Sequence, residues 1–148
     1  MSRKEEAEAL FRGGFNCAQS LLASYGAGFG IEREAALRLA SAMGGGMARS
    51  GEVCGAVSGG IMVIGLGFGP ANAWNKLQMG RVRKKAADFI EEFRAAHGGI
   101  RCRDLVGVNL ETREGRREAR RRRLFETRCA NYVRGAADIL ERLVPEAR

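Results

Sequence analysis

Apolar residues recur at helical spacing along most of this chain, and glycine pairs separate several of the stretches that show it. Residues 2–12 have this pattern and are followed by Gly13 and Gly14, a residue type that commonly ends helices. The only prolines are Pro70 and Pro145, so little in the chain interrupts a helix. No alternating apolar pattern of strand length and no internal repeat accompanies the helical one. The sequence therefore predicts an all-α fold.

Length and composition suit one domain with one hydrophobic core, because 148 residues with 45% apolar and 28% charged residues are typical of a globular domain. We expect residues 1–148 to form a single-domain bundle of about five to seven helices. Asn16 and Gln19 have the spacing of a capping box at the start of the second helix, and Leu39 in the third is expected to face the core. The expected helical ranges are 2–12, 16–26, 31–43, 54–68, 73–98, 100–107 and 113–143, the last with a break near Glu126.

The longest uncharged run, residues 53–75, does not predict a membrane span. Its most apolar part, residues 61–68, is far shorter than the roughly 20 apolar residues that cross a bilayer as a helix. Residues 1–20 carry charges of both signs and lack an apolar core segment, so they do not resemble a secretory signal peptide. We therefore expect a cytoplasmic protein, whose cysteines stay reduced and more often serve metal binding or redox chemistry than structural disulfides.

The chain has four cysteines, each in a different predicted helical segment. They are Cys17, Cys54, Cys102 and Cys129. No two of them form a C-x-x-C pair, a C-x-x-C-H haem motif or a paired zinc-ligand spacing, which argues against thioredoxin-like chemistry and covalent haem. A site that uses all four must therefore be assembled by folding.

Three of the cysteines are predicted near helix starts, namely Cys17, Cys54 and Cys102. The free N–H groups and positive end of a helix stabilise a thiolate, which is the form that attacks disulfides and binds metals. We expect Cys54 to be the most acidic of the four thiols. Cys129 lies nearer the middle of a helix, beside Arg128. The alternative interpretation is that each cysteine is a small buried apolar residue, which is a common role.

Small residues crowd the segment that starts at Cys54. Gly55 and Gly59 lie four residues apart and Gly60 adjoins them, so one face of a helix here would let another backbone come close. Each glycine costs roughly 1 kcal/mol relative to alanine in a helix. We expect the helix that carries Cys17 to pack on this face. The preceding loop contains further glycines whose backbone N–H groups could face the Cys54 thiolate: Gly44, Gly45, Gly46 and Gly51.

Four stretches, in this order, resemble a known family: GFNCAQSLL, GGGMARSGEVCGAVSGGIMVIGL, CRDLVG and RCANYV. Together they resemble the redox-active family C_GCAxxG_C_C over nearly the whole chain. The resemblance implies that four cysteines act as catalytic thiols or metal ligands: Cys17, Cys54, Cys102 and Cys129. The CGAxxG pattern begins at Cys54, and the resemblance implies that its other members lie at a cofactor site: Gly55, Ala56 and Gly59.

The resemblance implies a redox role, as an electron carrier or an oxidoreductase, without naming a substrate. The chain also resembles the iron–sulfur portion of split-Soret cytochromes, which implies four cysteine ligands of a [2Fe–2S] cluster. It lacks the C-x-x-C-H haem sites of those cytochromes, so haem is not implied. Two other uses of the same thiols stay open. One is cycling between dithiol and disulfide without a metal, and the other is a structural zinc site with four thiolates.

Residues 113–123 read REGRREARRRR and carry the strongest local charge in a chain of net charge +8. Such a helix could bind phosphates, but no aromatic interleaving or known DNA-binding motif accompanies it, so nucleic acid is the less favoured partner. An acidic redox partner protein fits the same charge, whereas a solvated face with pairs such as Glu118–Arg122 needs no partner. A dimer is compatible with the sequence, which leaves the oligomeric state open. The only histidine, His97, is expected at a helix end, where a cation suits the helix dipole.

Overall fold

The computed structural model describes residues 1–145, and the predicted all-α fold is confirmed. These residues form eight α-helices. They are α1 (Arg3–Arg12), α2 (Cys17–Gly26), α3 (Arg33–Leu39), α4 (Gly55–Phe68), α5 (Lys76–His97), α6 (Cys102–Val106), α7 (Arg113–Arg121) and α8 (Ala130–Leu143). Two 3-10 turns, Ala27–Phe29 and Ser41–Met43, and one π turn, Phe125–Cys129, lie between them.

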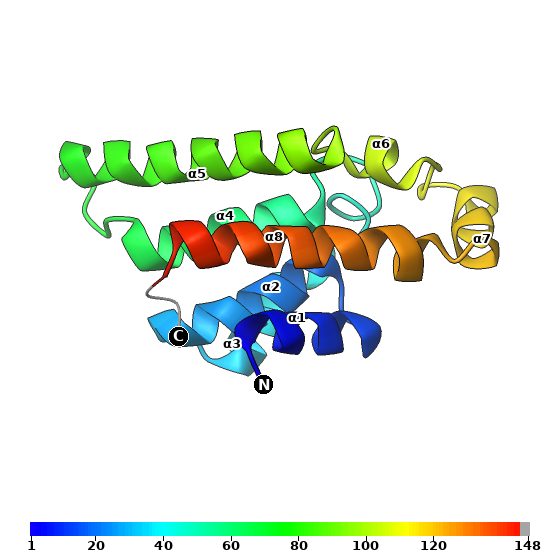
Figure 1. The fold of residues 1–148 in the computed structure, drawn as a ribbon, viewed down its shortest axis with the longest axis horizontal. Helices are drawn as coiled ribbons and strands as arrows, with labels where there is room; N and C mark the ends of the chain where they lie inside the picture. Colours follow the sequence, from blue (N-terminus) through cyan, green and yellow to red (C-terminus); the bar gives the residue numbers. More distant parts are fainter. Residues whose placement is uncertain (146–148) are drawn as a thin grey trace.

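Helix α8 lies at the centre of the bundle, where it contacts α1, α2, α4 and α5. In Figure 1, α5 runs along one side, α1, α2 and α3 gather on the other, and the short α6 and α7 lie at one end. The largest fully buried side chains include Tyr25, Phe89 and Phe93. Because Phe89 and Phe93 lie four residues apart on α5, this helix presents one apolar stripe to α4 and α8.

Several helix ends use the signals that the sequence contains. The predicted capping box at the start of α2 is present: the N–H of Gln19 donates to Oδ1 of Asn16 at 2.8 Å, and the N–H of Asn16 donates to Oε1 of Gln19 at 2.9 Å. Gly98 and Gly107 end α5 and α6 in the left-handed conformation, with φ of 88° and 84°. Local sequence therefore determines where these helices begin and end.

The predicted helix over residues 31–43 is too long. α3 ends at Leu39, and Ala40 leaves helical geometry with φ of −94° and ψ of 6° before the turn Ser41–Met43. Leu39 was expected to face the core but is 63% exposed. α3 packs mainly on α2 and the turn that follows, so its outer side, which carries Leu39, faces solvent.

The predicted helix over residues 113–143 is two helices, which brings the number of α-helices in residues 1–145 to eight, against about five to seven expected. Arg123, soon after α7, has a left-handed φ of 54°. The chain then enters the π turn Phe125–Cys129, which leads into α8. The break lies close to Glu126, where the sequence predicted it.

The small-residue face of α4 packs on α2, as predicted. A Cβ added to Gly59 would lie 2.9 Å from Cα of Ala18, and one added to Gly55 would lie 2.9 Å from the backbone nitrogen of Ala18. Gly60 belongs to a neighbouring face, because an added Cβ there would overlap the ring of Phe89 on α5. Close packing on two sides therefore accounts for Gly55, Gly59 and Gly60. Among residues 1–145, no helix combines the length and apolar character that crossing a bilayer requires.

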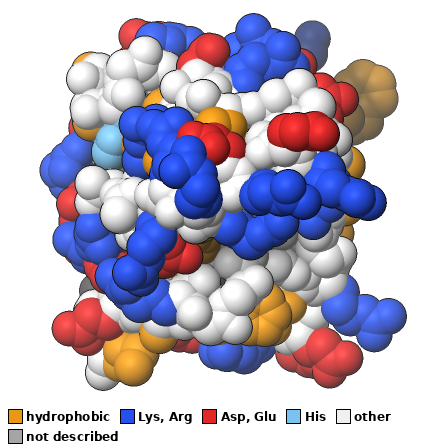
Figure 2. Space-filling view, turned by 90° about the vertical axis from the view of Figure 1, so that its right-hand side faces the viewer, with side chains coloured by type: hydrophobic (Ala, Val, Ile, Leu, Met, Phe, Trp, Pro, Cys, Tyr) orange, Lys and Arg blue, Asp and Glu red, His pale blue; other side chains and the backbone are white. Residues whose placement is uncertain are grey.

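Basic side chains are spread over the end of the bundle that α6 and α7 form (Figure 2). Glu118 on α7 accepts from Arg121 at 2.7 Å and lies 3.7 Å from Arg122, so the predicted pair with Arg122 is present. Arg113 and Arg117 on the same helix are exposed. Part of the charge of α7 is therefore compensated within the helix, and part of it is open to solvent.

Candidate functional site

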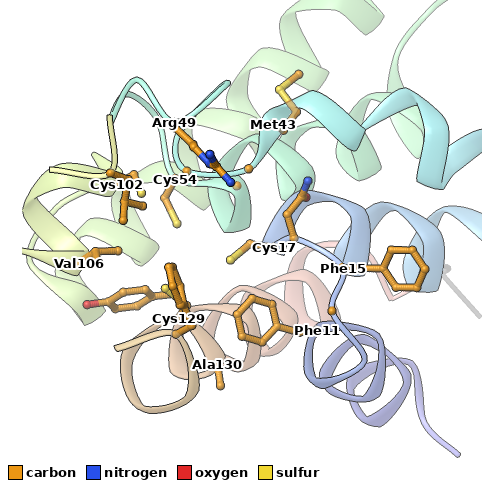
Figure 3. Close-up of a pocket in the computed structure, with 18 of the residues that line it drawn as sticks. Phe11, Phe15, Cys17, Met43, Arg49, Cys54, Cys102, Val106, Cys129 and Ala130 are labelled. Carbon is orange, nitrogen blue, oxygen red and sulfur yellow. The ribbon is translucent and has the colours of Figure 1, made fainter. Parts of the chain in front are cut away.

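All four cysteines line one cavity of about 770 Å³ near α6 and α7 (Figure 3). Cys17 begins α2, Cys54 immediately precedes α4, Cys102 begins α6, and Cys129 ends the π turn before α8. Cys17 is partly exposed, and the other three are buried. The fold thus brings together four thiols that lie far apart in the sequence.

A short backbone ladder places Cys54 beside Cys102. The N–H of Cys54 donates to the carbonyl of Ile100 at 2.8 Å, and the N–H of Cys102 donates to the carbonyl of Glu52 at 2.7 Å. The intervening residues Val53 and Arg101 form an isolated antiparallel bridge. The segments before α4 and before α6 therefore run side by side, and each presents its cysteine to the cavity.

Asn16 anchors the start of α2 and with it Cys17. Its Nδ2 donates to the carbonyls of Ala40 and Ser41 at 3.1 and 3.3 Å, while its Oδ1 caps the helix. The residue before the cysteine thus joins α2 to the segment after α3. This double role holds Cys17 at the wall of the cavity.

Cys129 reaches the cavity through a π turn. The N–H of Ala130 donates to the carbonyl of Phe125, five residues back, instead of four as in an α-helix. Arg128 donates to the carbonyl of Val106 at 2.8 Å and so ties this turn to α6. The sequence suggested Arg128 as a neighbouring charge for Cys129, and the structure shows it bonded to the backbone of α6.

The loop between α3 and α4 contains a left-handed turn. Five consecutive residues have φ between 51° and 72°: Gly45, Gly46, Met47, Ala48 and Arg49. A Cβ added to Gly46 would lie 2.6 Å from Cβ of Cys102, so a glycine is required there for close approach as well as for conformation. Left-handed residues with a Cβ are strained and are concentrated at functional sites.

The pKa of the Cys54 thiol is lowered, in the predicted direction. Its sulfur accepts a hydrogen bond from the thiol of Cys17, which is the largest cause. The backbone N–H groups of Ala56 and Val57 at the start of α4 also stabilise the thiolate, against the opposing effect of burial. The loop glycines were expected to supply such donors, but the N–H of Gly51 is used within the loop, where it donates to the carbonyl of Gly45.

A lowered pKa was also expected from the helix starts at Cys17 and Cys102, and this expectation is wrong. The pKa of Cys17 is raised well above its ordinary value because hydrogen bonding with Cys129 and Cys54 stabilises its protonated form and because the thiol is desolvated. Burial raises the pKa of Cys102 to about 12, and the neighbouring thiols add to the effect. A helix start stabilises a thiolate only where the sulfur accepts from the free N–H groups, and desolvation prevails elsewhere.

The three glycine-motif residues after Cys54 have different positions. Gly55 lines the cavity. Ala56 is buried and directs its N–H toward the sulfur of Cys54. Gly59 packs on Ala18, one turn of α4 away from Gly55, and contacts α2 instead of the cavity.

All four cysteines are free thiols, and no pair is bonded as a disulfide. Within residues 1–145, no three Cys, His, Asp or Glu side chains lie close enough together to bind one metal ion. The four thiols therefore surround a space instead of meeting at one point.

Residues 113–123, which contain Arg120, stand out in the sequence by their charge, but Arg12, Arg49 and the aromatic rings of the cavity do not. Arg12, Arg49 and Arg120 reach it from α1, the left-handed turn and α7. Its apolar wall includes Phe11, Phe15, Val106, Leu110 and Phe125. Because arginine is abundant throughout the chain, charge alone could not single out Arg12 or Arg49.

His97 ends α5 as predicted, but its ring is part of the core packing. It lies 4.5 Å from the ring of Phe93 and 5.2 Å from that of Tyr132, measured between centroids. Its Nε2 is buried without a hydrogen-bond partner and faces Gly135. Burial lowers the pKa of His97, so the ring is neutral at pH 7 and is not the charged cap that the sequence suggested.

The fold and this cavity define a class of protein: a helical bundle with four free thiols in one site. A family model described as "Putative redox-active protein (C_GCAxxG_C_C)" matches residues 15–143. The chain therefore belongs to the C_GCAxxG_C_C family. No curated protein and no solved structure matches the chain.

Proposed function

We propose that this protein is a small redox protein whose four cysteine thiols form one redox centre. The observation that carries the proposal is that all four line a single cavity in a member of a redox-active family. Hydrogen bonding with both Cys54 and Cys129 raises the pKa of Cys17, so these three thiols influence one another across the cavity. Cysteines that served only to fill a core would have no reason to converge in this way.

The first form of the centre is a [2Fe–2S] cluster bound by Cys17, Cys54, Cys102 and Cys129. When bound, such a cluster supplies one-electron transfer. Thiols that surround a space suit a cluster of more than one metal better than a single zinc ion, whose four sulfurs must each lie about 2.3 Å from it. The chain contributes the thiolate of Cys54, stabilised by backbone N–H groups, and the burial of Cys54, Cys102 and Cys129, which keeps water away from them.

A second form, without a metal, is favoured by the contact between Cys17 and the more acidic Cys54. The Cys54 thiolate would attack a disulfide substrate, form a mixed disulfide and release one thiol. The Cys17 thiolate would then attack the sulfur of Cys54, forming a Cys17–Cys54 disulfide and releasing the second thiol. One substrate disulfide is reduced to two thiols, and two cysteines of this chain are oxidised.

The redox partner that we propose is an acidic protein, because basic side chains are spread over the end of the bundle beside the cavity (Figure 2). Arg113 and Arg117 of α7 are exposed. The compartment that we propose is the cytoplasm, where thiols stay reduced.

Purification without oxygen tests both forms of the redox centre. Iron and acid-labile sulfide in equal amounts, with visible absorption that a mild reductant bleaches, would support the cluster. Single Cys→Ser changes at the four positions should each lower the iron content, while the remote change Arg83→Gln should leave it unchanged. Zinc in place of iron would indicate a structural site.

Metal-free protein that forms an internal disulfide reversibly would support the dithiol form instead. Peptide mass spectrometry should then locate the bond between Cys17 and Cys54. A protein that binds no metal and shows no reversible oxidation would contradict the proposed function.

A further inference from the structure

Four arginines line the thiol cavity. The side chain of Arg116 is engaged, because it donates to the carbonyls of Leu110 and Glu111 at 2.9 and 3.0 Å, and the other three come from three separate segments. Arg12 lies in the last turn of α1, Arg49 in the left-handed turn and Arg120 in α7. Within residues 1–145, the guanidinium groups of these three arginines have no hydrogen bond or ion pair. The carboxylate that also lines the cavity, Glu126, pairs with Arg123 at 3.4 Å, so it does not neutralise them.

Arg49 is held over the cavity at a conformational cost. It has a left-handed φ of 65°, which is unfavourable for a residue with a Cβ, and its N–H donates to the carbonyl of Gly44 at 2.9 Å. In Figure 3 its guanidinium extends from the loop toward the space between the cysteines. Strain of this kind persists where the surrounding structure enforces it, commonly at ligand-binding sites.

The cavity has the size of a small-molecule site. Its volume of about 770 Å³ falls within the range of roughly 300–1,000 Å³ typical of such sites. Apolar side chains form much of its wall, Cys17 is partly exposed at it, and the three arginines are exposed. The positive charge therefore lies on the solvent side of the buried thiols, where a diffusing molecule arrives.

We propose that Arg12, Arg49 and Arg120 form a binding site for a small anion, a molecule with a carboxylate or phosphate group, directly above the four thiols. The anion is the substrate of the redox centre, and this part of the proposal rests on the proposed function. The anion site itself depends only on the arginines and the cavity. A concave site with cations from three directions suits a small molecule better than the broad surface of an acidic protein.

Two reagents of similar size and different charge test the site. Iodoacetate is anionic and iodoacetamide is neutral, and both alkylate thiols. The rate of alkylation by iodoacetate divided by the rate with iodoacetamide should be measured on the full-length, metal-free protein. Mass spectrometry locates the modified cysteine. A change in thiol reactivity affects both reagents, so the ratio reports the attraction of the anion. The same ratio in urea-unfolded protein serves as the reference.

In the folded protein the ratio should exceed that of the unfolded protein. Arg12→Gln, Arg49→Gln and Arg120→Gln should each lower it by up to about fivefold at low salt, the effect of one unit charge at about 4 Å in water. Added salt should weaken the preference. Arg83→Gln is the matched control, because Arg83 is an exposed arginine of α5 outside the cavity. Inorganic phosphate should protect the thiols better than chloride at equal ionic strength.

Three results would overturn the proposal. The ratio could equal that of the unfolded protein, or Arg83→Gln could lower it as much as the cavity variants do. A polyglutamate peptide could protect the thiols where phosphate does not, which would assign the arginines to an acidic protein surface. The rate ratio does not depend on bound iron, so failure of the anion site and failure of the redox centre are separate outcomes.

Discussion

Replacing Gly59 by alanine separates close packing beside the site from helix propensity. The added Cβ would lie 2.9 Å from Cα and 3.0 Å from the carbonyl oxygen of Ala18. Carbon atoms in favourable contact are about 3.5–4.0 Å apart, so α2 and α4 must separate by roughly 0.5 Å or more. Both opposing atoms belong to the backbone, and no rotation of a side chain can relieve the overlap.

The expected change in the free energy of unfolding is the sum of two opposing effects. Overpacking costs roughly 1–3 kcal/mol, whereas replacing a helical glycine by alanine returns about 1 kcal/mol. Gly59→Ala should therefore lower the free energy of unfolding by up to about 2 kcal/mol. Gly65→Ala on the same helix is the matched control, because its added Cβ meets nothing within 4 Å. The control should raise the free energy of unfolding by about 1 kcal/mol.

Urea denaturation of the two variants in parallel measures the difference. Because Ala18 directly follows Cys17, Gly59→Ala should also displace the Cys17 thiol and lower iron occupancy or the yield of the Cys17–Cys54 disulfide. Gly65→Ala should change neither. If Gly59→Ala proves as stable as Gly65→Ala and keeps full occupancy of the site, the close contact between α2 and α4 does not exist.

In metal-free protein, the rate of Cys54 alkylation should rise with pH through a midpoint below the value of about 8.5 for free cysteine, because the pKa of Cys54 is lowered. A midpoint at or above that value would contradict the hydrogen-bond assignment, and Cys17→Ala should raise the midpoint by removing the largest stabilising donor. Ala48→Gly should raise the free energy of unfolding by roughly 0.5–1 kcal/mol in urea denaturation, because Ala48 has a left-handed φ of 51°; a loss of stability would argue against strain in this turn. Asn16→Ala removes the cap of α2 and the bond to the carbonyl of Ala40, so the free energy of unfolding should fall by about 1–2 kcal/mol in the same assay. An unchanged urea midpoint would show that the cap is dispensable.

Features governed by neighbouring residues were predictable from the sequence. The capping box of Asn16 and Gln19 and the glycine ends at Gly98 and Gly107 depend on a few adjacent residues, and the structure contains them. The packing of α2 on α4 was predictable for a similar reason, since Gly55 and Gly59 lie one turn apart and offer no side chain on that face.

Features that depend on tertiary contacts were not predictable. The end of α3 at Leu39 depends on the turn that Asn16 holds by hydrogen bonds to Ala40 and Ser41. The pKa values of Cys17 and Cys102 depend on burial and on thiols from other helices, which no helix-start argument includes. Arg49 lines the cavity because of a left-handed turn that has no sequence signal beyond the preceding glycines.

The glycines around Cys54 control how closely other backbones approach the thiols. A Cβ on Gly55 would lie 3.0 Å from Cβ of Cys17, and a Cβ on Gly46 would lie 2.6 Å from Cβ of Cys102. An alanine at position 55 would push Cys17 away from Cys54 through α2, and an alanine at position 46 would displace Cys102 and α6. With an alanine at position 55, Cys17 could no longer donate its hydrogen bond to Cys54, which is the largest cause of that thiol's lowered pKa. Gly55 therefore contributes to the acidity of Cys54, because the missing Cβ lets α2 bring the Cys17 thiol within hydrogen-bonding reach.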